Sequence, residues 1–307
     1  MSLLLRRLAI LAKIESSYGV DPTPSPSADA VIVENFNHSY PAELEDPPAS
    51  TGSISPTSHV LLRRTAEITF DVPLKGSGAA GTAPEWGPLL RACGFSETID
   101  PGVSVTYEPE STSIASVTIY AYVDGLLMEF NGCRGNVVLS AIAADKARLS
   151  FTFRGKPAAP VDAAFPTISN TDTTSALRVE SATFTVGGDV LSINGLTVDM
   201  QNEVEFADDI TQANALGEAV LGARLPVGTI NPEAVLVATK DLYGIWSANT
   251  QQAIALSLGS VAGNQVAISI PDARFRELTP GDRQGAFIYD IPFTCVGSDD
   301  EVSIVLT

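Results

Sequence analysis

Apolar and polar residues alternate along much of the chain from residue 59 onward, a pattern that predicts β-strands. In residues 65–74, for example, Ile68, Phe70 and Val72 are separated by single polar residues. A period of two places one set of side chains in a core and the other set in water. The sequence therefore predicts a mainly β chain.

Turn signals divide these strands into three long hairpins. The first turn, Asp124-Gly125, suits a type I′ geometry, and the third turn is Gly187-Gly188. The expected hairpins span 117–130, 136–154 and 177–200, and later strands are expected at 253–258, 266–270, 286–296 and 302–306. No convincing internal repeat is visible, although the hairpins on either side of residues 157–175 raise the question.

Residues 1–58 predict an extended N-terminal arm ahead of a β-rich domain at 59–307. Proline-rich stretches at 21–27 and 41–56 cannot form helices or continuous strand ladders, because proline fixes φ and lacks an N–H. Only one short strand is therefore expected in the arm, near residues 30–34.

Two other segments bear on location and contacts. The apolar start of the chain is interrupted by Arg6, Arg7 and Lys13 and lacks a cleavage site, so it is expected to belong to the mature chain and not to span a membrane. Residues 157–175 show no periodicity, and a loop of that length is typical of a functional or partner-contacting segment.

One stretch predicts a short helix lying on a sheet. Thr82 and Glu85 have the spacing of a capping box, and Pro84 suits a first turn. The helix is expected over residues 83–92 and to end at Gly94. Its apolar face would consist of Trp86, Leu89, Leu90 and Cys93. A helix this short is marginal in water, so that face is expected to pack on the sheet.

The glycines ahead of this helix match a nucleotide-binding fingerprint. Gly76, Gly78 and Gly81 follow a predicted strand and precede a helix, as in a dinucleotide-binding loop. The downstream chain lacks the alternation of strands and helices that such a fold requires. A connector made of small residues is the favoured interpretation, and a nicotinamide-dependent oxidoreductase is the weakest alternative.

Charge and composition favour a structural role over catalysis. The chain has 36 acidic and 18 basic residues, a formal net charge of -18, so it lacks the basic balance of proteins that bind nucleic acid or anionic lipid. Three widely spaced cysteines are expected to be small core residues in a reducing compartment. With only two histidines, a histidine-rich metal site is excluded, and no cofactor is expected.

Acidic residues gather in one segment, at Asp199, Glu203, Glu205, Asp208 and Asp209. Such a cluster could hold a hard cation or form an acid–base pair. Nothing in the sequence supplies a converging basic or histidine partner, and the EF-hand spacing is absent. A solvated acidic face is the favoured interpretation. Arg63-Arg64, beside a strand start, is expected to be a surface or interface pair.

Three segments carry a resemblance to a known family. They are residues 11–24 (LAKIESSYGVDPTP), 76–95 (GSGAAGTAPEWGPLLRACGF) and 291–301 (IPFTCVGSDDE). Together they resemble tail tube (major tail) proteins of long-tailed, non-contractile bacteriophages, with order and spacing that match over nearly the whole chain.

The resemblance implies packed antiparallel β-sheets, in a sandwich-like or barrel-like fold, with one flanking helix. It also implies homohexameric rings that stack into a tail tube in the virion, assembled in the host cytoplasm. Expected partners are other copies of the chain and the tail tip, tape measure and tail terminator proteins. Genomic DNA would pass through the lumen without specific binding, which an acidic wall favours because it offers no counterion release.

On this basis, the hairpins 117–130 and 177–200 are candidates for ring-forming strands. The arm 1–58 and the loop 157–175 are candidates for contacts between stacked rings. The acidic cluster is a candidate lumen face. The alternative from another class is a β-sandwich binding module of a tail tip, baseplate or adhesin, against which the 7% aromatic content argues mildly.

Overall fold

The computed structural model describes residues 3–46, 52–55, 57–169 and 174–307. The chain is mainly β, with several antiparallel sheets and two short helices, α1 (Gly87–Arg91) and α2 (Leu242–Ser247). The strand pairings among the described residues branch without closing into a barrel. This confirms the predicted fold class, in its sandwich-like form.

A first sheet has the strand order β2-β1-β9-β10-β11-β6-β3. Its strands are β1 (Leu8–Ile14), β2 (Ala30–Val31), β3 (Glu34–Ser39), β6 (Ala66–Pro73), β9 (Val117–Val123), β10 (Leu126–Ile142) and β11 (Arg148–Pro157). The turn between β9 and β10 consists of Asp124 and Gly125, both at positive φ, as expected for a type I′ turn. The first two predicted hairpins are therefore confirmed, and they share β10.

A second sheet has the strand order β14-β13-β19-β20-β22-β18-β15. Its strands are β13 (Thr183–Val186), β14 (Asp189–Val190), β15 (Ile193–Asp199), β18 (Val227–Pro232), β19 (Gln252–Val261), β20 (Asn264–Phe275) and β22 (Ala286–Cys295). Short strands extend both sheets: β7 (Phe95–Asp100), β8 (Ser104–Pro109), β12 (Val161–Asp162), β21 (Thr279–Arg283) and β23 (Ser303–Leu306). The four predicted C-terminal strands correspond to β19, β20, β22 and β23.

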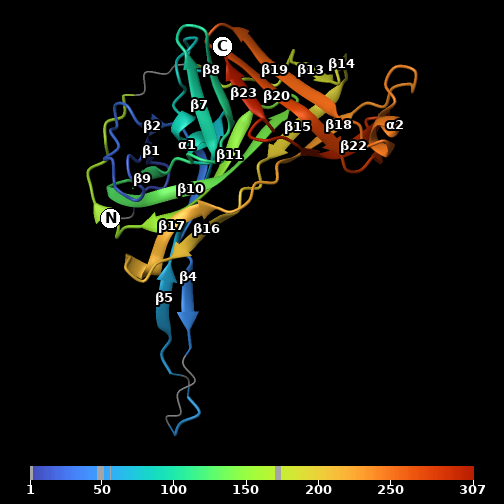
Figure 1. The fold of residues 1–307 in the computed structure, drawn as a ribbon. Coiled ribbons are helices and arrows are strands. Elements are labelled where there is room, and N and C mark those ends of the chain that lie inside the picture. Colours follow the sequence, from blue (N-terminus) through green and yellow to red (C-terminus); the bar gives the residue numbers. More distant parts are fainter. Residues whose placement is uncertain (1–2, 47–51, 56, 170–173) are drawn as a thin grey trace.

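Strand β10 joins the two sheets. Its first half pairs with β9, and its last five residues pair with β15 of the second sheet. A register shift near Gly132, which has a φ of 60°, separates the two halves. A bulge of this kind bends a strand and increases its twist. One long strand can therefore serve two sheets, which lie side by side in Figure 1.

One continuous apolar core contains residues from both sheets. Its largest fully buried side chains include Trp86, Tyr107, Phe70, Phe130, Phe151, Phe153 and Phe293. Cys93, Cys133 and Cys295 are buried free thiols, as the sequence predicted. Burial raises the pKa of Cys93 and Cys133 well above the usual range and that of Cys295 to about 12.

The prediction of a single short strand in residues 1–58 is wrong. The described part of this range holds four strands, β1 to β3 and β4 (Ala42–Glu45). Strand β1 pairs with β9 along its whole length, and its residues 9–12 are buried. A strand covered on both faces carries no alternation, which is why the pattern was missed. The division of the chain at residue 58 stays a prediction.

The predicted capping box is also wrong. Helix α1 begins at Gly87 with Trp86 as its N-cap and has no side-chain cap, although Gly94 adopts the expected positive φ. The Glu85 carboxylate instead lies 3.3 Å from the buried Lys75 ammonium and accepts the Ile32 N–H at 3.2 Å. A buried cation requires a partner, and this demand outweighs a local cap.

The third predicted hairpin is only partly correct. Strands β13 and β14 meet at the expected turn, where Gly187 and Gly188 both have positive φ. The other edge of β13 pairs with β19, and β15, which follows β14, pairs with β10 and β18. Leu196 and Val198 of β15 are buried in the core, so long-range packing overrides the local hairpin.

Candidate functional site: a projecting ribbon and an apolar groove

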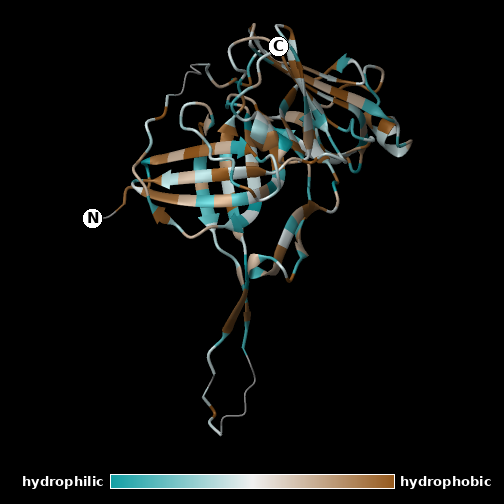
Figure 2. Cartoon of the chain, turned by 60° about the vertical axis from the view of Figure 1, so that its left-hand side comes forward, coloured by the Kyte–Doolittle hydropathy of each residue, from teal (hydrophilic) through white to brown (hydrophobic). Residues whose placement is uncertain are grey.

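A two-stranded ribbon projects from the body of the molecule. It consists of β4 and β5 (Val60–Arg64), which pair with each other only, among the residues that the structure describes. Figures 1 and 2 show the ribbon standing clear of both sheets in two views. An isolated two-stranded ribbon is at best marginally stable in water. A contact beyond its own two strands is therefore needed to hold it.

Part of that contact comes from a second ribbon, β16 (Val204–Asp208) with β17 (Leu216–Leu221), next to the 3-10 turn Ala213–Ala215. The Arg63 guanidinium forms an ion pair with Asp208. Arg64 donates to the Asn214 side-chain oxygen at 2.7 Å. The predicted surface pair Arg63-Arg64 thus joins the bases of the two ribbons.

The second ribbon is anchored to the first sheet. The Ala219 N–H donates to the Tyr18 hydroxyl at 2.7 Å, and Tyr18 donates in turn to the Gly132 carbonyl at 3.1 Å. Burial is the main cause that raises the pKa of Tyr18 to about 12. Arg134, itself buried, donates to the Ala219 carbonyl and pairs with Glu218 at 2.8 Å. The ribbon bases are therefore fixed at the bend of β10.

The outer part of the first ribbon exposes apolar side chains. Leu44 is 56% exposed, and Val60, Leu61 and Leu62 are between 46% and 49% exposed. Leu44 and Leu61 are direct cross-strand partners. Exposed apolar residues grouped on a projecting strand pair are typical of a protein–protein contact. This ribbon, with β4 in the predicted arm and β5 just after it, is the strongest candidate assembly surface.

The five acidic residues from the sequence lie along β15, β16 and their exits without converging. Asp199 accepts from the Asn136 amide at 2.7 Å, Asp208 pairs with Arg63, and Asp209 accepts from Thr211. Glu203 and Glu205 line shallow polar hollows beside Arg154. Among the described residues, no group of three His, Cys, Asp or Glu side chains could hold a metal ion.

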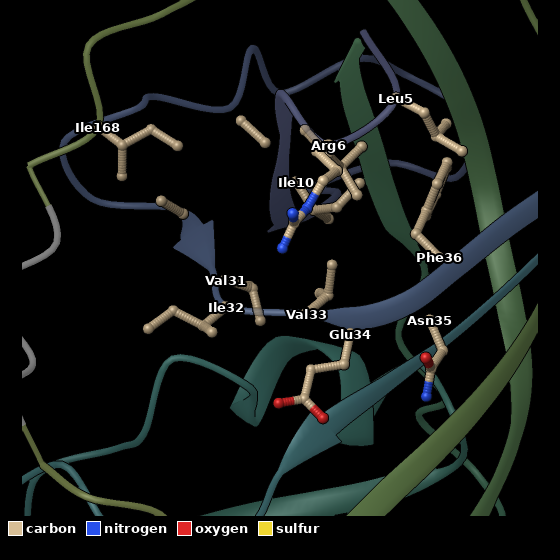
Figure 3. A pocket seen from close by; sticks show the side chains of 13 residues that line it. Leu5, Arg6, Ile10, Val31, Ile32, Val33, Glu34, Asn35, Phe36 and Ile168 are labelled. Atoms are coloured by element: carbon tan, nitrogen blue, oxygen red, sulfur yellow. The ribbon is translucent and has the colours of Figure 1, made fainter.

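An apolar groove of about 690 Å³ lies between β1 and the β2–β3 segment (Figure 3). Its walls include Ile10, Val31 and Phe36, with Ile168 from the long loop. Glu34, at its edge, is neutralised by Lys146. The Arg6 side chain reaches over the groove in Figure 3. The groove therefore combines apolar walls with a cation at its rim.

The glycine loop is occupied by packing within the chain. The Gly76 N–H donates to Asn264 at 2.8 Å, and the Gly78 N–H donates to the Gly263 carbonyl at 3.0 Å. A Cβ at Gly76 would lie 2.1 Å from that same carbonyl oxygen. These glycines permit a close approach to the β19–β20 turn, which accounts for the fingerprint without a nucleotide.

The predicted flanking helix lies against the core. Trp86, Leu89, Leu90 and Cys93 are fully buried. The Trp86 indole N–H donates to the Lys75 carbonyl at 3.0 Å, and its ring packs 5.3 Å from that of Tyr107. Neither helix in the described part of the chain is long and apolar enough to cross a membrane.

Glu15, which no sequence pattern indicated, links the end of β1 to the bend of β10 through its carboxylate. Its carboxylate is buried and accepts four hydrogen bonds of 2.6–2.7 Å, from the Gly19 and Gly132 N–H groups and from the Ser116 and Thr118 hydroxyls. A lone glutamate after an apolar strand gives no sequence signal for such a role.

Comparison with known proteins identifies the family. The family model described as "Phage tail tube protein" matches residues 6–295 of this chain. No curated protein matches it. The match covers both ribbons and every strand except β23, in agreement with the tail tube part of the resemblance in the sequence. The chain therefore belongs to the phage tail tube protein family.

Proposed function

We propose that the chain is the structural subunit of the tail tube of a long-tailed, non-contractile bacteriophage. Copies of it form six-membered rings that stack into a hollow tube, and the genome passes through the lumen during ejection. The tail tip, tape measure and tail terminator proteins contact the same assembly in the virion. Assembly takes place in the host cytoplasm.

The projecting ribbon of β4 and β5 is the observation that carries this proposal. Four exposed apolar residues on a strand pair outside the core do not stabilise a monomer. A neighbouring ring offers a surface that would cover them. The family match to residues 6–295 supports a partner that is another copy of the chain.

The net charge of -18 supports the role of the lumen. A DNA duplex carries dense negative charge and binds where cationic side chains release its counterions. An acidic wall supplies no such release, so the duplex can slide. The segment from Asp199 to Asp209 is a candidate part of that wall.

Negative-stain electron microscopy of the purified protein across a concentration series tests the proposal. Hollow tubes of stacked rings are expected, and antibody against the chain is expected to label virion tails along their length. The ribbon variant Leu44→Asp/Leu61→Asp is expected to stay monomeric with an unchanged melting temperature. Labelling confined to the tail tip, with no tubes, would instead favour a tail-tip or adhesin-type binding module.

A further inference from the structure

The two sheets have the same topology. Strands β1, β2, β3, β6, β9, β10 and β11 of the first correspond, in chain order, to β13, β14, β15, β18, β19, β20 and β22 of the second. The spatial order also corresponds strand for strand, β2-β1-β9-β10-β11-β6-β3 against β14-β13-β19-β20-β22-β18-β15. Every pairing in both sheets is antiparallel.

Features between the strands correspond as well. The ribbon β4–β5 lies between β3 and β6, and the ribbon β16–β17 lies between β15 and β18. Helix α1 follows β6 just as α2 follows β18. The register shift where Val117 faces Cys133 recurs where Gln252 faces Ala273. Seven strands, a ribbon, a helix and a bulge in the same places are not expected by chance.

We infer that the chain is a tandem duplication of one module, and we propose that the junction between its two modules is repeated between neighbouring copies. The second module of one copy would then contact the first module of the next copy through the equivalent of the β10–β15 contact within a chain. This inference rests on the proposed function and revises one part of it: the six positions of the ring are filled by six modules, which belong to three chains and not to six.

The junction within the chain shows what such a contact buries. The end of β10 pairs with the outer edge of β15, for example Ser140 with Thr197. Beside this pairing, the second module has a groove of about 230 Å³ between β13 and the β14–β15 segment. Ala141 and Ala143, from the tip of the β10–β11 hairpin of the first module, line it.

The corresponding groove of the first module is the larger one shown in Figure 3, about 690 Å³. Its walls occupy equivalent positions, since Ile10 corresponds to Phe184 and residues 30–35 correspond to residues 190–195. No hairpin tip enters it within the described chain. The outer edge of β3, equivalent to that of β15, pairs with no described strand. The first module thus lacks the neighbour that the second module has.

The matching free surface is the hairpin of β21 and β22. Strand β21 lies where the second half of β10 lies, and its outer edge pairs with no strand among the described residues. Phe287, next to the tip, is 53% exposed and gives this free hairpin an apolar side chain. Asp282 on the hairpin and Arg6 at the groove rim have opposite charges, and in the described part of the chain neither has an ion-pair partner. A second copy of the chain supplies both halves of this contact.

Crosslinking of equivalent positions tests the proposal. By the alternation of inward and outward side chains, Asp282 holds the position of Ser140, and Asn37 holds that of Thr197. The variant Asn37→Cys/Asp282→Cys, assembled into tubes and treated with a short bis-maleimide, is expected to give a ladder that ends at three times the 32.2 kDa chain mass. The native cysteines are buried and are expected not to react.

Controls and outcomes separate this inference from the proposed function. The single variants Asn37→Cys and Asp282→Cys are expected to give no ladder, and Ser140→Cys/Thr197→Cys is expected to crosslink only within the chain. Tubes with a ladder that extends to six chains, or with no ladder, would overturn the three-chain ring and leave the tube intact. Absence of tubes, both from purified protein and along virion tails, would overturn the proposed function and this inference with it.

Imaging of unmodified tubes gives an independent readout if the cysteine variants fail to fold. Cross-sections reconstructed by cryo-electron microscopy are expected to show threefold symmetry, with two alternating kinds of module around the lumen. Strict sixfold symmetry, with one chain in each sixth of the ring, would contradict the proposal.

Discussion

Arg63 of β5 forms an ion pair with Asp208, which ends β16, 145 residues later in the chain. The pair joins two ribbons that occupy equivalent places in the two halves of the chain. Asp208 is 81% exposed in its side chain, so water screens the pair. We therefore expect the pair to orient the ribbon β4–β5 and to contribute little to folding.

The variant Asp208→Ala is therefore expected to impair assembly while leaving the stability of the fold nearly unchanged. Removing an exposed ion pair costs at most about 1 kcal/mol of unfolding free energy. The ribbon would lose its direction, and tube growth followed by light scattering is expected to slow. Arg178→Ala, which removes the exposed pair with Glu180, is the matched control and should leave growth unchanged. A large fall in melting temperature for Asp208→Ala would contradict this account.

Trp86→Ala is expected to destabilise the fold strongly. Truncating a fully buried tryptophan leaves a large cavity and an unpartnered Lys75 carbonyl, with a cost of about 3–5 kcal/mol. Trp86→Phe retains much of the packing and should cost less. Chemical denaturation of the three proteins measures both differences. Equal stability of all three would mean that the helix does not depend on this side chain.

Glu15→Ala is expected to cost more than about 3 kcal/mol, because it leaves several buried donors without an acceptor. The first strand and the bend of β10 should then exchange amide hydrogens faster than the rest of the sheet. Glu108→Ala removes a carboxylate from an exposed position on β8 and serves as control. Protection of Leu8–Ile14 that is unaltered in the Glu15 variant would argue against the linking role.

His38 is expected to make stability fall in mild acid. The centroid of its ring lies 5.6 Å from that of Phe36 and 5.4 Å from that of Tyr40. Burial lowers its pKa below the usual 6.5. The folded state therefore favours neutral His38, while the unfolded chain takes up a proton near pH 6.5. Stability is complete above pH 6.5 and declines as the pH falls through that value toward the folded pKa. Denaturation midpoints between pH 5 and 8 measure this slope, which His38→Gln should reduce.

The sequence predicted the parts of the fold that local pattern encodes. Alternation located β6 and β11, and Asp124-Gly125 located the turn of the first hairpin. Local pattern failed to predict the features that depend on contacts between residues distant in the sequence. Strand β1 is covered on both faces, and β15 pairs with β10 instead of forming a local hairpin. Glu85 pairs with Lys75 instead of capping the helix, because that buried ammonium needs a carboxylate.

The candidate assembly surfaces, too, could be predicted only in part from local sequence. Arg63-Arg64 could be assigned to a surface or interface pair from their position, but their partners lie in another ribbon. The equivalence of the two halves was invisible because it resides in pairing order and buried positions: Ile10 corresponds to Phe184, and Phe130 to Ile270. Different apolar residues fill equivalent places equally well, so the pattern of contacts persists after residue identity has been lost.

The continuity of β10 has a mechanical consequence. Within a chain, one covalent strand crosses from the first sheet into the second, so bending one half against the other must strain a peptide backbone and its ladder. Between chains only noncovalent edges would meet. A tube of such subunits would alternate stiff and compliant seams around its circumference, and we expect it to yield first along the compliant ones.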